Sequence, residues 1–242
     1  MDLYDSVIRR TEELTGSSAA VRYDYSPSAA WTDVGSNELV MLKDAAFELG
    51  GSNQPAVNYT CVTSDPSLVD RDEILVYGKD LSSLNSDAPF ARIALVRVGN
   101  IENETSDDPE KLFRAVQDVD FVKYHVFPKG YMVRSSGESN REQVRISRDA
   151  RQRGISFRSV GCDYIQNYKK NPNVEAVKLI FVTAADANYP EMQKDARKVH
   201  DITLTLSKIL EGMPTDCTTC GLKDVCDEVE GLRELHFGQK EI

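Results

Sequence analysis

Three of the five cysteines in this sequence lie close together, at Cys217, Cys220 and Cys226. The C-x2-C spacing of the first two lets both thiolates reach one ion from a tight turn. Thiolates are soft ligands that select zinc or an iron–sulfur cluster, and in a reducing cytoplasm such a group is more often a metal site than a disulfide framework. We therefore predict a metal or cluster site formed by these three residues. The alternatives are structural thiols and a C-x2-C redox pair.

The spacing does not identify a fourth ligand for this site. His236 follows Cys226 by ten residues, which is about three turns and roughly 15 Å along a helix. The two side chains therefore cannot share one ion unless the helix ends early. A water, a second chain, Cys61 or Cys162 could complete the site. Cys61 falls in a predicted strand and Cys162 in a predicted helix, where a small buried thiol is the usual interpretation.

A second group of residues that could do chemistry is rich in arginine. Guanidinium groups match phosphate oxygens in bidentate geometry, and a helix that begins after Ser147 would add amides that bind an anion. This pattern predicts a pocket for a phosphorylated small molecule, such as a nucleotide-based cofactor. The alternative is that the arginines form surface ion pairs with the surplus of acidic residues. The seven arginines of residues 133–158 are Arg134, Arg141, Arg145, Arg148, Arg151, Arg153 and Arg158.

Several catalytic patterns are absent from the sequence. It contains no G-x-S-x-G, no H-E-x-x-H, and neither a G-x-G-x-x-G nor a P-loop motif. The histidines His125, His200 and His236 lie far apart, and the spacing of the long helix predicted at 189–212 places His200 on its polar side. The residues therefore do not predict hydrolytic chemistry.

The elements that must position these residues follow from hydrophobic periodicity and from caps. A mixture of strands and helices, with strands dominating the first half, predicts an α/β (α+β) fold with a mixed β-sheet flanked by helices and a short cysteine-containing helical tail. We also predict short strands at 38–44 and 45–51 that pair as a hairpin and end at Gly50 and Gly51. An ordinary hairpin turn is the favoured interpretation of the two glycines, and a close approach of the backbone is the alternative. Strands are predicted at 56–64 and 73–81, and buried strands at 91–100 and 176–184. Helices are predicted at 2–15, 106–122, 146–154, 159–173, 189–212 and 224–237.

Length, net charge and hydropathy limit the possible domain organisation and the possible partners. The 242 residues can bury one large core, and we predict an N-terminal helix and loop at 1–36, an α/β domain at 37–212 and a cysteine-rich tail at 213–242. A net charge of −10 argues against non-specific nucleic-acid binding. No apolar run approaches the roughly 20 residues of a membrane helix, and the charged N-terminus is unlike a signal peptide. We therefore expect a cytoplasmic protein with neither nucleic acid nor membrane as a partner.

The order of these features resembles a known family. The segments AFELGGSNQPAV, ILVYGKDL and IALVRVGN are followed by VRISRDARQRGISFRSVGCDYIQNYKK, VEAVKLIFVT, a long helix and the C-x2-C. From about residue 40 to 226 this order resembles the middle region of CO-methylating acetyl-CoA synthase, the beta subunit of the carbon monoxide dehydrogenase/acetyl-CoA synthase complex. The resemblance implies that residues 37–212 form an α/β domain whose arginine-rich surface binds coenzyme A.

The resemblance also implies roles for particular residues. Arg141, Arg145 and Arg148 fall in the matching stretch, and with Arg151 they are the predicted ligand-binding residues. Cys217 and Cys220 stand where the family's cluster motif begins, whose thiolates ligate the [4Fe–4S] part of the nickel-containing A-cluster. Cys226 is then a candidate third ligand.

The sequence also departs from the family pattern. The spacing from Cys220 to Cys226 is shorter, no fourth cysteine follows, and both the C-G-C tripeptide that holds the distal nickel and the large N-terminal domain are absent. We therefore expect an accessory or regulatory protein of one-carbon or corrinoid-linked anaerobic metabolism. It would bind an iron–sulfur cluster or zinc, and coenzyme A or another phosphorylated ligand. Its expected partners are the other subunits of a carbon monoxide dehydrogenase/acetyl-CoA synthase or corrinoid-protein system. The alternatives are a catalytic subunit completed by a partner chain and a zinc-binding structural adaptor, so whether the chain is an enzyme stays open.

Overall fold

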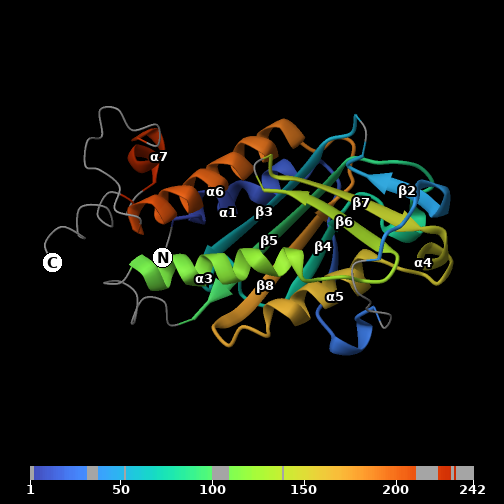
Figure 1. The fold of residues 1–242 in the computed structure, drawn as a ribbon, viewed down its shortest axis with the longest axis horizontal. Helices are drawn as coiled ribbons and strands as arrows, with labels where there is room; N and C mark the ends of the chain where they lie inside the picture. The colour runs from blue at the N-terminus through green and yellow to red at the C-terminus, as the bar shows by residue number, and fades with distance from the viewer. Residues whose placement is uncertain are drawn as a thin grey trace, which may run out of the picture.

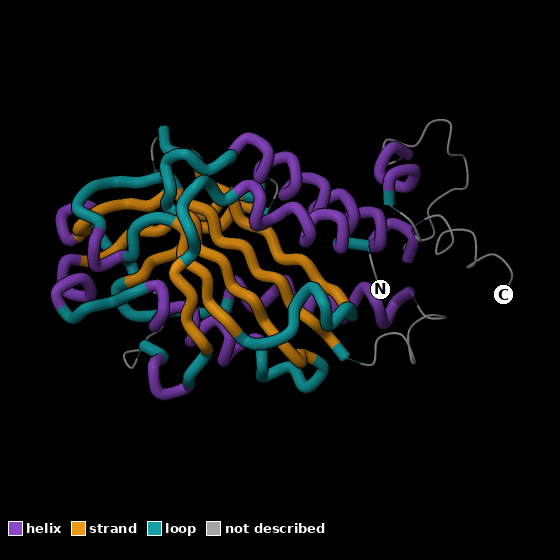
Figure 2. Tube along the Cα trace, turned by 180° about the vertical axis from the view of Figure 1, so that it is seen from behind, coloured by secondary structure: helices purple, strands orange, loops and turns teal. Residues whose placement is uncertain are grey.

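The structure is a computed structural model that describes residues 3–31, 38–51, 53–99, 109–137, 139–210, 223–229 and 232. Helices lie on both sides of two β-sheets (Figures 1 and 2). The strands are β1 Val21–Asp24, β2 Ala45–Leu49, β3 Ala56–Thr63, β4 Glu73–Tyr77, β5 Phe90–Val98, β6 Tyr131–Ser136, β7 Arg141–Ser147 and β8 Val174–Val182. The helices are α1 Asp5–Thr11, α3 Pro109–Phe121, α4 Arg148–Gln152, α5 Phe157–Tyr168, α6 Tyr189–Leu210 and α7 Lys223–Glu228, and the 3₁₀ turn η5 spans Val122–Tyr124.

The larger sheet is mixed and has the strand order β1-β4-β8-β5-β3. β4 pairs with β8, and β3 with β5, in parallel, whereas β1–β4 and β5–β8 are antiparallel. Helices cover both faces. On one face the Tyr59 hydroxyl lies 3.2 Å from that of Thr11 of α1, and on the other Arg92 lies over the ring of Tyr164 of α5. Every residue of β3 is therefore buried, including the polar Asn58 and Thr60.

The smaller sheet is antiparallel, with the order β2-β7-β6. Burial alternates along β7, because Glu142, Val144 and Ile146 face the larger sheet while Arg141 and Arg145 face outward. The guanidinium of Arg92 donates two hydrogen bonds of 2.6 Å to the carboxylate of Glu142, and both side chains are fully buried. This pair joins the two sheets through their interior.

The structure confirms the mixed α/β fold and corrects one local prediction. Residues 38–51 do not form a hairpin, because Leu42–Asp44 is a 3₁₀ turn and β2 pairs with β7 instead. Gly50 has φ +63°, and a Cβ there would lie 2.7 Å from the Cβ of Ala56. The glycine therefore allows the end of β2 to approach β3 closely. None of the described helices is long and apolar enough to span a membrane.

Candidate functional site

A cavity of about 420 Å³ lies beside β3, the edge strand of the larger sheet. Its floor is Tyr59 and Thr60 of β3. The end of α3 and η5 form one wall, α6 forms the other, and the turn between β6 and β7 adds Gly137 and Asn140. Cavities of roughly 300–1,000 Å³ hold small molecules in proteins, so this cavity is large enough for one.

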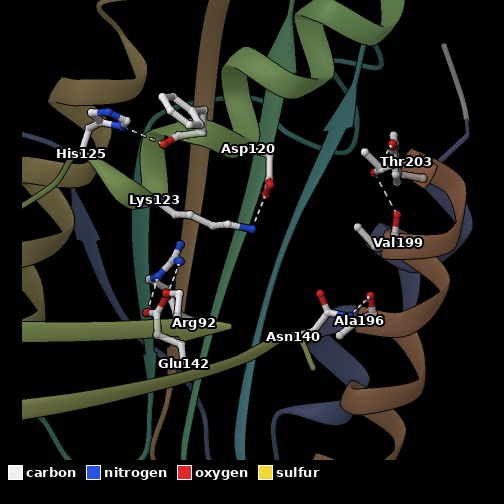
Figure 3. Close-up of polar contacts among 12 residues, drawn as sticks. Arg92, Asp120, Lys123, His125, Asn140, Glu142, Ala196, Val199 and Thr203 are labelled. Carbon is white, nitrogen blue, oxygen red and sulfur yellow. Dashed lines mark hydrogen bonds and ion pairs between the residues drawn. The ribbon is translucent and has the colours of Figure 1, made fainter. Parts of the chain in front are cut away.

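A lysine and an aspartate meet on the first wall of the cavity. The Nζ of Lys123 donates a 2.8 Å hydrogen bond to Oδ1 of Asp120, and Figure 3 shows the lysine extended toward this carboxylate. The Lys123 side chain is only 7% exposed, and its ammonium lies 5.1 Å from the ring centre of Tyr124. An ammonium has three protons, so Lys123 keeps donors for a bound molecule after it has paired with Asp120.

The opposite wall is held by side-chain hydrogen bonds to the backbone. The Thr203 hydroxyl donates to the carbonyl of Val199 at 3.0 Å, and Nδ2 of Asn140 donates to the carbonyl of Ala196 at 3.0 Å (Figure 3). The backbone N–H of Asn58 donates to the Asn140 carbonyl at 2.8 Å. Asn140 has φ 47°, a left-handed conformation that asparagine tolerates better than most residues. The two bonds of Asn140 fix the β6–β7 turn to both α6 and β3, whereas the Thr203 bond lies within α6.

The buried Arg92–Glu142 pair lies in the same region of the fold (Figure 3). Burial alone disfavours the charged form of Arg92, but the Glu142 carboxylate outweighs it and the pKa of Arg92 is raised. The Ser135 hydroxyl donates to Glu142 at 3.0 Å. Burial raises the pKa of Tyr131 and of Tyr164, whose hydroxyls have no hydrogen-bond partner among the described residues. The pair is therefore a structural ion pair, and it holds β7 and the turn before it in place.

The predicted arginines fall into two groups. Arg141, Gln143 and Arg145 lie on the outer face of β7. Arg134 of β6 is directly opposite Gln143, so it lies diagonally across from both Arg141 and Arg145. The Nε of Arg145 donates to Glu48 at 2.6 Å, and Arg145 also donates to the Val40 carbonyl at 2.7 Å. A groove of about 200 Å³ runs over this surface. We call the outer surface of the β2-β7-β6 sheet that carries Arg134, Arg141 and Arg145 the arginine face.

Arg148 and Arg151 are instead part of α4. Arg148 is exposed and pairs with no acid among the described residues, whereas Arg151 donates to the side-chain oxygen of Asn85 and lies 5.9 Å from the ring centre of Phe47. The Ser147 hydroxyl accepts the Ala150 N–H at 3.0 Å and so caps α4, which has only five residues. Ser147 therefore caps a helix. Arg148 and Arg151 lie on α4, apart from Arg134, Arg141 and Arg145 on the sheet.

The structure describes three of the five cysteines, Cys61, Cys162 and Cys226. Cys217 and Cys220, like His236, lie outside the described residues, whereas Cys226 is half-buried in α7. Cys61 and Cys162 are buried in β3 and α5, and burial raises the pKa of both thiols. No group of three or more His, Cys, Asp or Glu that could hold a metal occurs in the part of the chain that the structure describes. The metal site therefore stays a prediction from the sequence.

Comparison with protein-family models and with curated proteins gives no relative. No family model matches the chain, and no curated protein matches it significantly. The resemblance to the acetyl-CoA synthase beta subunit therefore rests on the sequence segments quoted above.

No motif in the sequence predicts the cavity beside β3. Lys123, Asn140 and Thr203 belong to no motif, and helical spacing predicts His200 on the polar side of its helix. In the structure His200 is half-buried and lines the cavity, because η5 and the β6–β7 turn lie across from α6. The only local signal was the turn-forming sequence GESN before β7.

Proposed function

We propose that this chain is an accessory or regulatory protein related to the beta subunit of the carbon monoxide dehydrogenase/acetyl-CoA synthase complex, and that it binds coenzyme A or another phosphorylated ligand on the arginine face. The observation that supports the ligand is the shared face of Arg134, Arg141 and Arg145. Arginines on neighbouring strands place guanidinium groups on one face, and each guanidinium can donate two parallel N–H bonds to a phosphate.

The charges on this face favour an anion. Arg145 is paired with Glu48, but Arg134 is exposed and pairs with no described acid, and Arg141 makes only a 3.4 Å bond to the Gln54 carbonyl. The face therefore carries a net positive charge in a chain whose net charge is −10. An isolated basic patch on an acidic protein attracts anions locally while the rest of the surface repels extended polyanions such as nucleic acid.

The terminal cysteines form the second part of the proposal. Cys217, Cys220 and Cys226 supply thiolates of the kind that bind a [4Fe–4S] cluster or zinc, with the fourth ligand supplied from elsewhere. Anaerobic purification followed by metal analysis and a visible spectrum tests this part. We expect iron or zinc to co-purify and to be lost in Cys217→Ser/Cys220→Ser, and a colourless wild type with neither metal would contradict it.

Calorimetric titration with coenzyme A tests the ligand. We expect the wild type to bind with a Kd below about 1 mM and Arg134→Gln/Arg141→Gln to bind at least about tenfold more weakly. Arg145 is left intact because it also holds Glu48 and the Val40 carbonyl. Arg71→Gln is the matched control, since Arg71 is exposed and lies just before β4 in the other sheet. Equal affinity in the double variant and the control would contradict the arginine face.

A further inference from the structure

The cavity beside β3 has features of a binding site that the arginine face does not explain. Both signs of charge line it, since Lys123 is paired with Asp120 and the exposed Asp118 of α3 is also among the lining residues. The Lys123–Asp120 pair is neutral as a unit, and two of its ammonium protons have no hydrogen-bond acceptor among the described residues. The cavity therefore offers one surplus carboxylate and a separate set of hydrogen-bond donors.

The floor of the cavity adds backbone groups. β3 pairs with β5 on one side only, and on the other side the Asn58 N–H donates to the Asn140 carbonyl. Backbone groups alternate along a strand, so the N–H and C=O of Thr60 point to the same unpaired side as those of Asn58. No backbone hydrogen bond joins Thr60 to α3, α6 or the β6–β7 turn within the described chain. Thr60 therefore presents one donor and one acceptor to the cavity.

Apolar and aromatic side chains line the cavity together with the polar side chains of Gln117, Asn140, His200 and Thr203. Val116 and Val199 face the cavity from the two walls, and the rings of Phe121 and Tyr124 lie 6.0 Å apart with exposures of 59% and 40%. Exposed aromatic rings beside a cavity are unusual on a soluble surface and mark ligand or partner contacts more often than a random patch does. An apolar group of a ligand would be covered there.

We propose that this cavity binds a free α-amino acid with an apolar or aromatic side chain. The ammonium of the ligand pairs with Asp118, its carboxylate accepts from Lys123 and the Thr60 N–H, and its side chain packs on Val116, Phe121 and Val199. A phosphate monoester fits this lining poorly, because its two negative charges would face two aspartates with a single lysine and no arginine fork. This site is separate from the arginine face, so either proposal can fail without the other.

Three matched probes test the proposal by NMR titration of the ¹⁵N-labelled full chain. They are L-phenylalanine, 3-phenylpropionate, which lacks the amine, and 2-phenylethylamine, which lacks the carboxylate. We expect phenylalanine to bind at least about tenfold more tightly than either fragment, with saturable shifts at the amides of Thr60, Lys123 and His200. Equal affinities of the three probes, or no saturable shift up to about 20 mM phenylalanine, would overturn the proposal.

Two variants locate the charges. Lys123→Met should weaken phenylalanine and 3-phenylpropionate about tenfold and should not weaken 2-phenylethylamine, because it leaves the Asp120 carboxylate free to attract the amine. Asp118→Asn should weaken phenylalanine and 2-phenylethylamine and leave 3-phenylpropionate unchanged. Asp118 is exposed, so its variant keeps the test decisive if Lys123→Met does not fold. Lys170→Met, at an exposed lysine beyond α5, is the control and should bind all three probes as the wild type does. If both variants weakened the same set of probes, the assignment of Lys123 to the carboxylate and Asp118 to the ammonium of the ligand would be overturned.

Discussion

Replacing Asp163 by Asn should make the protein more stable at neutral and alkaline pH. Asp163 is 3% exposed on α5, and its Oδ2 has no hydrogen-bond partner among the described residues. Burial raises the pKa of Asp163 to about 7, and the backbone N–H of Trp31 offsets this only in part. Asn keeps the shape and an acceptor for Trp31 but carries no charge to desolvate.

Proton linkage gives the sign and size of the stability difference between Asp163→Asn and the wild type. The native state holds the Asp163 proton more tightly than the unfolded state, whose aspartate titrates near 3.8, so the native state loses stability as pH rises from about 4 to 7. A difference of roughly three pH units at about 1.4 kcal/mol each gives about 4 kcal/mol, and relaxation and water penetration around the charged carboxylate reduce this to about 2 kcal/mol. Asp163→Asn should therefore be about 2–4 kcal/mol more stable than the wild type at pH 8 and equal to it near pH 4.

Urea unfolding at several pH values between 4 and 8 measures this difference. Trp31 is the only tryptophan, and its backbone contact with Asp163 makes its fluorescence a local reporter. The wild type should show a fluorescence titration with a midpoint near pH 7 that the variant lacks. Parallel stability profiles for the two proteins would refute the reasoning, because Asp163 would then not be protonated by burial.

Three further predictions follow from the fold. Arg92→Met should cost about 3–5 kcal/mol because it leaves Glu142 charged and buried, and Arg92→Met/Glu142→Leu should cost less; chemical unfolding measures both, and a larger loss in the double variant would contradict this. Gly78→Ala should destabilise more than Gly154→Ala in thermal melts, since both have positive φ but only at Gly78 would a Cβ meet the Ala184 nitrogen, at 2.5 Å; equal melting temperatures would count against it. Brief alkylation and mass spectrometry should find Cys61 and Cys162 unmodified until urea is added, because burial raises the pKa of both thiols; modification of the folded protein would show that they are accessible.

Elements whose pattern is local were predictable from the sequence. β5 and β8 carry continuous apolar runs, which fit a strand covered on both faces. Ser147 caps α4 as predicted, and α5 ends at Tyr168, before the turn that leads to Pro172. These features depend on neighbours a few residues apart, so the sequence contains them.

β7 and the cavity depend on contacts between distant segments. Glu142 occupies an inward position on β7, which breaks the apolar alternation, and its partner Arg92 lies 50 residues earlier in the chain. The pairing of Arg134 with the arginines of β7 requires the β6–β7 register, and His200 faces a cavity that only the packed helices create. No local pattern carries this information, because each feature is fixed by burial against another element.

The comparison of coenzyme A with pantetheine, which lacks its phosphates and nucleotide, tests the central claim most directly. Calorimetry on the wild type should give a Kd below about 1 mM for coenzyme A and no measurable binding of pantetheine at the same concentrations, because the arginine face recognises phosphate. Equal binding of the two molecules, or no heat with coenzyme A, would contradict the account.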